Sequence, residues 1–128
     1  MNSRSKGKRG ELEFAKYLVA HFLDQTVDGE TVEARRGCQY SGRAISGEDS
    51  PDVITNLPCH FEVKRTERLR LYDSLEQAVR DGGDKAGVAH KANHKPWVAI
   101  MPMDQFLDFL ADRIGENREE QEHHGNGN

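Results

Sequence analysis

Residues 51–65 read Pro-Asp-Val-Ile-Thr-Asn-Leu-Pro-Cys-His-Phe-Glu-Val-Lys-Arg, and this stretch decides the fold. The turn sequence at residues 56–58 lies between two short segments that we predict to be strands, so the stretch forms a β-hairpin. A tight hairpin places its two strands side by side. The carboxylates of Asp52 and Glu62, ten residues apart in the sequence, can therefore reach one ion.

The second strand of this hairpin presents a carboxylate and an amine together. Residues two apart on a strand point to the same side of the sheet, so Glu62 and Lys64 project together. Val63 between them turns into the core. Taken alone, the pair also fits an exposed strand face with a salt bridge, which contributes little to stability.

Two carboxylates and a lysine in this arrangement suit phosphodiester chemistry. Carboxylates provide the oxygen ligands that a hard cation such as Mg²⁺ requires. We expect Asp52 and Glu62 to be the central ligands, with the backbone carbonyl of Val63 as a further one. Lys64 would position a water molecule or stabilise charge on a phosphate, and the sequence leaves both roles open.

A third carboxylate comes from a helix predicted at residues 8–24. Its apolar residues recur at helical spacing, and they are Leu12, Ala15, Leu18, Val19, Phe22 and Leu23. Glu11 falls inside this apolar arc, where a lone carboxylate is costly to bury. We expect Glu11 to complete the metal site, and the alternative is an exposed residue in the first turn. Glu13 falls on the opposite side and is predicted to lie on the surface.

The order of these motifs resembles the PD-(D/E)xK nuclease superfamily. Within it, the chain looks like the small resolvase-like nucleases of phages and prophages, which are similar to archaeal Holliday junction resolvases. The resemblance extends over residues 6–110 and is carried by residues 8–13, 35–37, 39–42, 51–52, 61–65, 90–93 and 96–100.

This resemblance implies a restriction-endonuclease-like α/β fold, with a mixed central sheet flanked by helices in the order α-β-β-β-α-β-β-α. It implies a Mg²⁺-dependent endodeoxyribonuclease, for which Mn²⁺ can substitute, with Glu11, Asp52, Glu62 and Lys64 as catalytic residues. Four-way (Holliday) junctions are the expected substrate, and symmetrical cutting of two strands implies a homodimer. The alternatives are another phage repair, flap or restriction-like nuclease, and a catalytically silent DNA-binding module on the same fold.

The pattern along the chain predicts the same order of elements. Helices are expected at 8–24, 71–81 and 104–114, and strands at 31–36, 52–55, 60–64, 86–90 and 97–101. By composition we predict a flexible basic arm at 1–7, a nuclease domain at 8–115 and a disordered acidic tail at 116–128. The last helix and the exposed edge of the sheet are the candidate dimer surfaces.

The formal net charge of −4 is unevenly distributed along the chain. Residues 104–128 hold seven acidic and two basic residues, so the rest of the chain is close to neutral. Basic clusters flank the candidate metal ligands, as expected for contacts to phosphates, although any single cluster also fits a solvated surface. The residues predicted to contact DNA are Lys6, Lys8, Arg9, Arg35, Arg36, Gln39, Ser41, Arg43, Arg65, Arg68 and Lys91.

The composition also indicates the cellular compartment in which the protein is expected. No apolar run approaches the roughly 18 residues of a membrane span, and the polar N-terminus lacks the apolar core of a signal peptide. A cytoplasmic setting is therefore expected, and the resemblance to phage and prophage nucleases implies that the cell is a bacterial host. Cys38 and Cys59 are then expected to be reduced thiols. Their spacing lacks a Cys-x-x-Cys pattern, which argues against a zinc site with His60 or His90.

Overall fold

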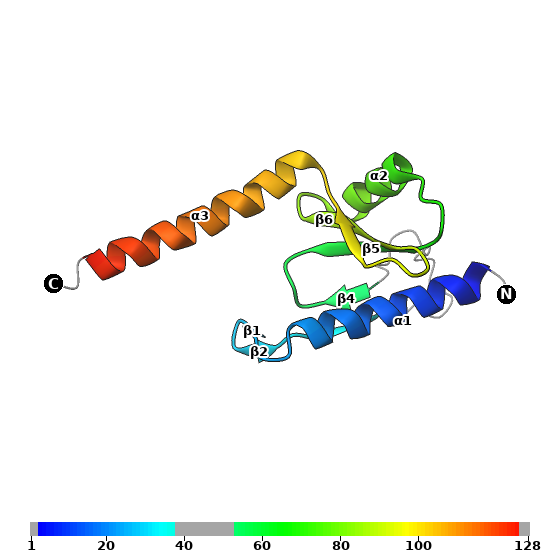
Figure 1. The fold of residues 1–128 in the computed structure, drawn as a ribbon, viewed down its shortest axis with the longest axis horizontal. Helices are drawn as coiled ribbons and strands as arrows, with labels where there is room; N and C mark the ends of the chain where they lie inside the picture. The colour runs from blue at the N-terminus through cyan, green and yellow to red at the C-terminus, as the bar shows by residue number, and fades with distance from the viewer. Residues whose placement is uncertain (1–2, 38–52, 126–128) are drawn as a thin grey trace.

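In the computed structural model the described residues are 3–37 and 53–125, with side chains described for 7–37 and 53–116. Their elements are, in order, α1 (Ser3–His21), β1 (Thr26–Val27), β2 (Glu30–Thr31), β3 (Ala34–Arg36), β4 (Val53–Thr55), β5 (His60–Arg65), α2 (Leu71–Gly82), β6 (Ala86–Lys91), β7 (Val98–Ile100) and α3 (Met103–Gly125). The sheet lies between α1 and α2, and α3 projects away from both (Figure 1). The predicted α/β class, with a mixed sheet flanked by helices, is confirmed at this level.

The main sheet has the strand order β3-β4-β5-β6-β7. The pairs β3–β4, β4–β5 and β6–β7 are antiparallel, whereas β5 and β6 are parallel. Parallel neighbours need a crossover connection, and α2 provides it. The predicted hairpin is present over the described residues, because Val53 of β4 pairs with Phe61 of β5. β5 is therefore the central strand of the sheet.

Helices pack on both faces of the main sheet. Strand residues point alternately to its two sides, so each face contributes its own core residues. On one face the core joins α1 to three strands, through Phe14, Ala15, Leu18, Val53, Val63 and Ala89. On the other face α2 packs on β6, through Ala78, Ala86 and Val88. β5 consequently turns Val63 toward α1 and its neighbours Glu62 and Lys64 toward α2.

A second, two-stranded sheet precedes the main one and was not predicted. β1 and β2 pair so that Val27 lies opposite Glu30, which leaves a two-residue loop. Both loop residues have positive φ, 52° at Asp28 and 82° at Gly29. Asp-Gly is a favoured sequence for a hairpin turn of this kind. The expected strand at 31–36 is thus divided between β2 and β3.

The two ends of the chain differ from the expectation. Residues 3–7 of the predicted flexible arm belong to α1, which begins at Ser3. The predicted disordered tail at 116–128 is helical as far as Gly125, because α3 continues past Gly115. Six of the ten residues from Glu116 to Gly125 are Glu, Gln or Arg, which favour helices without forming an apolar stripe. Among the described residues, no helix has the length and apolar character needed to cross a membrane.

Candidate functional site

β5 places a buried carboxylate at the centre of the α2 face. Glu62 is only 3% exposed, although ionisable residues are rarely buried this deeply without partners. Lys64 Nζ lies 3.5 Å from Glu62 Oε1. The prediction that these two side chains project together, with Val63 in the core, is confirmed. The alternative of an exposed strand face is wrong for Glu62.

Helix α2 contributes polar groups to the same face. Lys64 Nζ donates a hydrogen bond to Gln77 Oε1 at 3.3 Å. Near the end of the helix, Asp81 meets His60 and Glu62, and one possible ligand atom from each of these three residues lies within 4.8 Å of the others. Donor atoms this close together, two of them on carboxylates, could hold one metal ion.

A glycine allows this close approach of α2 to β5. A Cβ atom at Gly82 would collide with the side chain of His60. The helix ends immediately afterwards, where Gly83 has a φ of 68° and donates its N–H to the carbonyl of Val79 at 2.8 Å. The helix predicted at 71–81 thus ends one residue later than expected, at Gly82, and the positive φ at Gly83, which glycine adopts readily, accompanies that end.

The carboxylate of Glu11 comes from α1, which packs on the other face of the sheet. Burial raises the pKa of Glu11, an effect that the hydrogen bond and positive charge of Arg36 oppose and the negative charge of Glu62 reinforces. Arg36 Nε donates to Glu11 Oε2 at 2.7 Å. Glu11 is therefore a partly buried carboxylate within electrostatic reach of Glu62, as its place in the apolar arc suggested. Its role as a metal ligand stays a prediction.

Several predicted site residues lie outside the described residues. They are Asp52 and the candidate DNA contacts Gln39, Ser41 and Arg43, together with Cys38 and the side chain of Lys6. The described residue next to Asp52 is Val53, which pairs with Phe61, the residue before Glu62.

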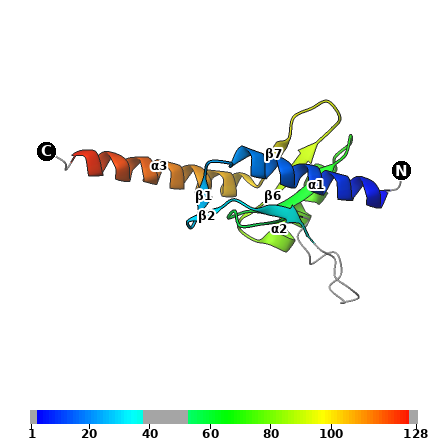
Figure 2. The same ribbon diagram turned by 90° about the horizontal axis from the view of Figure 1, so that it is seen from below.

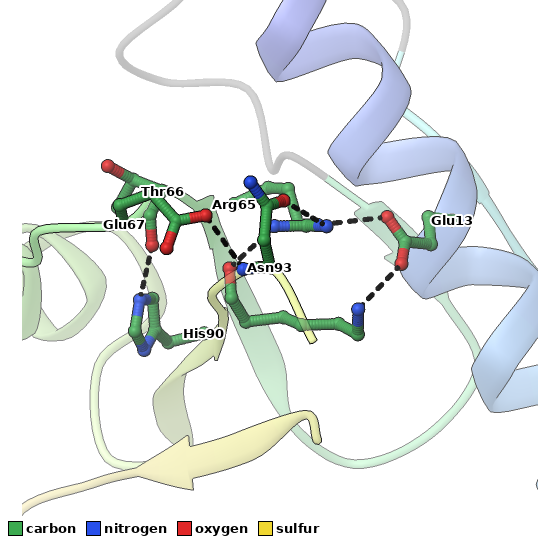
Figure 3. A network of polar contacts seen from close by, with 7 residues as sticks. Glu13, Arg65, Thr66, Glu67, His90 and Asn93 are labelled. Atoms are coloured by element: carbon green, nitrogen blue, oxygen red, sulfur yellow. Dashed lines mark hydrogen bonds and ion pairs between the residues drawn. The ribbon is translucent and has the colours of Figure 1, made fainter. Parts of the chain in front are cut away.

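Glu13 was predicted to lie on the surface, and 41% of its side chain is exposed, but it also forms ion pairs that were not predicted. Its carboxylate joins α1 to the ends of two strands, 3.1 Å from Arg65 Nε of β5 and 3.6 Å from Lys91 Nζ of β6. Figure 3 shows Glu13 pointing from α1 toward Arg65. Helical phase predicted only that Glu13 lies outside the apolar arc of α1. It could not predict that the ends of β5 and β6 lie on that side of the helix.

The same network fixes the segments that follow β5 and β6 (Figure 3). Arg65 also donates to Asn93 Oδ1 at 3.0 Å, and the backbone N–H of Asn93 donates to Glu67 Oε1 at 2.8 Å. A ring nitrogen of His90 lies 2.8 Å from the carbonyl of Thr66. These contacts hold the segment between β6 and β7 against the end of β5.

The candidate DNA contacts consequently fall into two groups. Arg65 and Lys91 are mostly buried against Glu13, and Arg36 is paired with Glu11. Four others are exposed to solvent, namely Lys8, Arg9, Arg35 and Arg68. The exposed group is the better placed to meet phosphates, and contact with DNA stays a prediction for both groups.

Of the two cysteines, the structure describes Cys59. Its thiol is half-buried and donates weakly to the carbonyl of His60 at 3.5 Å. Burial raises the pKa of the Cys59 thiol, so in the absence of a metal the neutral thiol is favoured over the reactive thiolate.

Sequence reasoning missed His60, Gln77 and Asp81. His60 precedes Glu62 by two residues on the same strand, so strand alternation could have placed both on one face. Gln77 and Asp81 are four apart, which puts them on one side of α2. Nothing in the sequence indicated that this side of α2 would cover β5.

The chain matches no family model, no curated protein and no solved structure in our comparisons. The functional inference therefore depends on the chemistry of the site. A buried carboxylate with a second one within 4.8 Å is costly unless a cation or a proton balances the charge. Carboxylate oxygens with one imidazole nitrogen fit a divalent cation such as Mg²⁺ or Mn²⁺.

Proposed function

We propose that this chain is a metal-dependent DNA endonuclease on a restriction-endonuclease-like fold. The observation that carries the proposal is the deep burial of Glu62 beside Lys64 on the central strand, 3% exposed and within reach of a second carboxylate. Ionisable groups gathered and buried in this way occur most often at functional sites. The reaction class in this proposal is taken from the resemblance to the PD-(D/E)xK nucleases.

The metal ligands in this proposal are Asp52, Glu62 and the carbonyl of Val63, with Glu11 completing the set. Asp81 and His60 are added because their donor atoms lie near those of Glu62. The oxygen-rich set of ligands favours Mg²⁺. Mn²⁺ would also accept these oxygens together with the imidazole nitrogen of His60. A divalent cation bound there would neutralise the scissile phosphate and lower the pKa of a bound water.

Lys64 has the geometry of a charge-stabilising group in this proposal. Glu62 and Gln77 hold its ammonium between β5 and α2, at 3.5 and 3.3 Å. A lysine fixed in this way needs little reorganisation when negative charge develops on a phosphate. The exposed arginines and lysines flanking the site would bind the DNA backbone, chiefly through charge.

For the substrate we propose branched DNA, with four-way junctions first, in a bacterial cytoplasm. This part depends on the resemblance to phage resolvase-like nucleases, which also implies a homodimer with two sites. Another repair, flap or restriction-like nuclease is the second candidate, because it would use the same site. A catalytically silent DNA-binding module is the third.

The decisive experiment compares Glu62→Gln with Glu76→Gln, a matched change at an exposed position of α2. Each protein is incubated with Mg²⁺ and a four-way junction, with duplex, single-stranded and flap DNA as separate substrates. We expect the wild type and Glu76→Gln to cut the junction, and Glu62→Gln to bind it without cutting. Calorimetric titration with Mn²⁺ should show binding lost only in Glu62→Gln.

The outcomes separate the three candidates. Cleavage of flap or duplex DNA in preference to the junction would replace the resolvase assignment by the second candidate. Absence of both cleavage and metal binding in the wild type would leave the silent module. Cleavage by Glu62→Gln at the wild-type rate would refute the site itself.

A further inference from the structure

Three mostly buried donor groups meet where the end of α2 covers the start of β5. His60, Glu62 and Asp81 each place one possible ligand atom within 4.8 Å of the other two. Their side chains keep between 4% and 14% of their surface exposed. Two carboxylates that lie so close together and so far from water repel each other unless a positive charge lies between them.

The positive charges of the protein itself lie at the margins of this cluster. Lys64 Nζ lies 3.5 Å from Glu62 Oε1, one of the two oxygens of that carboxylate. The other oxygen, Oε2, lies 4.0 Å from His60 Nε2, which is too far for a hydrogen bond. Arg80 approaches Asp81 at 3.6 Å, but 66% of its side chain is exposed. The lysine therefore serves one oxygen of Glu62, and the second oxygen faces the cluster.

The spacing of the donor atoms fits one metal ion. Zinc lies about 2.0–2.2 Å from nitrogen and oxygen ligands, so two of its ligand atoms are about 3.0–4.2 Å apart, depending on the angle between them. The 4.0 Å between Glu62 Oε2 and His60 Nε2 falls in this range. No separation in the cluster exceeds 4.8 Å, so side-chain movements of about 0.6 Å at most bring all three groups onto one ion.

The cluster is distinct from the ligands proposed for the nuclease site. Among the residues whose side chains the structure describes, it is the only group of three or more such donors, and Glu11 is not a member of it. Glu11 comes from α1, which packs on the other face of the sheet from α2. In Figure 1 the sheet separates the two helices, and Figure 2, seen from below, has α1 in front of the sheet. Glu62 is therefore the residue that the cluster shares with the set Asp52, Glu62, Val63 and Glu11.

The donor types select a class of metal. Mg²⁺ prefers oxygen ligands and keeps several waters, whereas an imidazole nitrogen favours first-row transition metals such as Zn²⁺. Three protein ligands are also the number found at zinc sites that keep a fourth position for water. For a given site, affinity rises from Mn²⁺ to Zn²⁺, so the expected order of affinity is Zn²⁺, then Mn²⁺, then Mg²⁺. The set needs no cysteine, so it differs from the zinc site that the sequence argues against.

The backbone holds the strand ligands and the helix ligand together. The N–H of His60 donates to the carbonyl of Lys85 at 2.7 Å, which ties the start of β5 to the segment after α2. A Cβ atom at Gly82 would lie 2.4 Å from Cβ of His60. Glycine next to Asp81 therefore lets the end of the helix approach the strand this closely, and the ligand positions are set by the fold.

We propose that His60, Glu62 and Asp81 bind a divalent transition-metal ion of their own, which links the end of α2 to the start of β5. His60 and Asp81 then belong to this ion and not to the Mg²⁺ of the nuclease site, with which it shares Glu62. An ion that binds only the folded chain stabilises it, so the first effect of this ion is on stability. The inference goes beyond the proposed function, since that effect needs neither DNA nor cleavage.

The test is thermal unfolding of chelator-treated, dialysed protein, with Zn²⁺, Mn²⁺ or Mg²⁺ added separately. At a concentration about 100 times the dissociation constant, a bound ion should raise the Tm by roughly 10 °C. The cluster variants are Asp81→Asn and His60→Gln. The controls are Asp73→Asn, at an exposed position of α2, and Glu11→Gln, which alters only the nuclease ligands.

Zn²⁺ should raise the Tm of the wild type and of both controls, and by more than Mg²⁺ does at the same concentration. In each cluster variant the dissociation constant for Zn²⁺, measured by calorimetry, should rise roughly tenfold or more, since even residues that only orient a metal ligand contribute about 10–100-fold. The number of Mn²⁺ ions bound per chain should fall by one relative to Asp73→Asn. Far-UV circular dichroism checks the metal-free fold, and the two cluster variants lie on different elements, so each tests the site without the other.

Three results would overturn the proposal. A wild-type Tm that responds to none of the ions would indicate that a protonated His60 pairs with Glu62 in place of a metal. Stabilisation by Zn²⁺ that persists in both cluster variants would place the ion elsewhere on the chain. Equal stabilisation by Zn²⁺ and Mg²⁺ would assign the effect to the oxygen ligands alone. None of these results bears on the nuclease proposal, which is tested by cleavage in Mg²⁺.

Discussion

Gly10 sets how closely α1 approaches the central strand. A Cβ atom at this position would lie 2.5 Å from Cβ of Arg65, whereas carbon atoms in contact are ordinarily about 3.5–4.0 Å apart. Gly10→Ala therefore requires α1 and β5 to separate by about 1 Å at this point. Glu11 follows Gly10 directly and Glu13 is three residues after Gly10, so the movement would disturb both the candidate metal site and the contact with Arg65.

The expected cost follows from two opposing effects. Forcing an extra methyl group into a packed contact costs about 1–3 kcal/mol, whereas replacing glycine by alanine within a helix gains about 1 kcal/mol. Gly7 provides the matched control, because a Cβ atom there would meet nothing within 4 Å. Gly7→Ala should thus be stabilising, and Gly10→Ala should be less stable than Gly7→Ala by about 1–3 kcal/mol.

Urea unfolding followed by tryptophan fluorescence measures this difference. The sequence has one tryptophan, Trp97, and its ring centroid lies 4.9 Å from that of Phe14 on α1. The signal therefore reports on the contact between α1 and the sheet. Gly10→Ala should also bind Mn²⁺ more weakly than Gly7→Ala, because separating α1 from β5 would displace Glu11, one of the candidate ligands. Equal stability of the two variants would refute the close approach of α1 to β5.

Three further predictions concern charge. Lys64→Ala should stay folded and bind Mn²⁺ but cut DNA about 10²–10³-fold more slowly, and wild-type rates in single-turnover assays would contradict its role. Because the pKa of Glu11 is raised in the folded state, ionising this carboxyl lowers the stability of the fold above that pKa. Metal-free Glu11→Gln should therefore be more stable than the wild type at about pH 7. This difference in stability should disappear by about pH 4, where Glu11 of the wild type is protonated. If urea unfolding shows that Glu11→Gln stays more stable than the wild type in acid, or becomes more so, the pKa of Glu11 is not raised by folding. If roughly five phosphates are bound, log affinity should fall with log salt at a slope of about −4 to −5, and a flatter slope is expected when alanine replaces the four exposed basic residues Lys8, Arg9, Arg35 and Arg68.

Local patterns were enough to predict the central part of the fold. The turn at residues 56–58 and the alternation along β5 predicted the hairpin and the shared direction of Glu62 and Lys64. The helical pattern at 71–81 predicted α2 to within one residue of its observed end. Each of these features depends on neighbours in the sequence, which is why they could be found without the structure. The β1–β2 hairpin has an equally local signal in Asp28-Gly29, and it was overlooked.

The remaining features depend on contacts between distant segments. Helical phase predicted that Glu13 leaves the apolar arc, but only the packing of α1 on the sheet brings it to Arg65 and Lys91. Asp81 joins Glu62 because α2 crosses above β5 at a short distance that Gly82 permits. The length of α3 was underestimated because its second half lacks an apolar stripe, which is the signal that periodicity detects.

The surroundings of Glu62 bear on whether the proposed site is functional or only a structural ion pair. A structural pair is best served by burying both partners in a fully hydrogen-bonded setting, yet Lys64 keeps 31% of its side chain exposed while Glu62 keeps 4%. A second carboxylate, Asp81, lies close to the buried one, and a third, Glu11, is near enough for its pKa to respond to Glu62. Arg80 approaches Asp81 at 3.6 Å, but its side chain is 66% exposed, so water screens its charge. Like charges gathered around a buried carboxylate lower the stability of the folded chain, and binding a divalent cation among them would offset that cost.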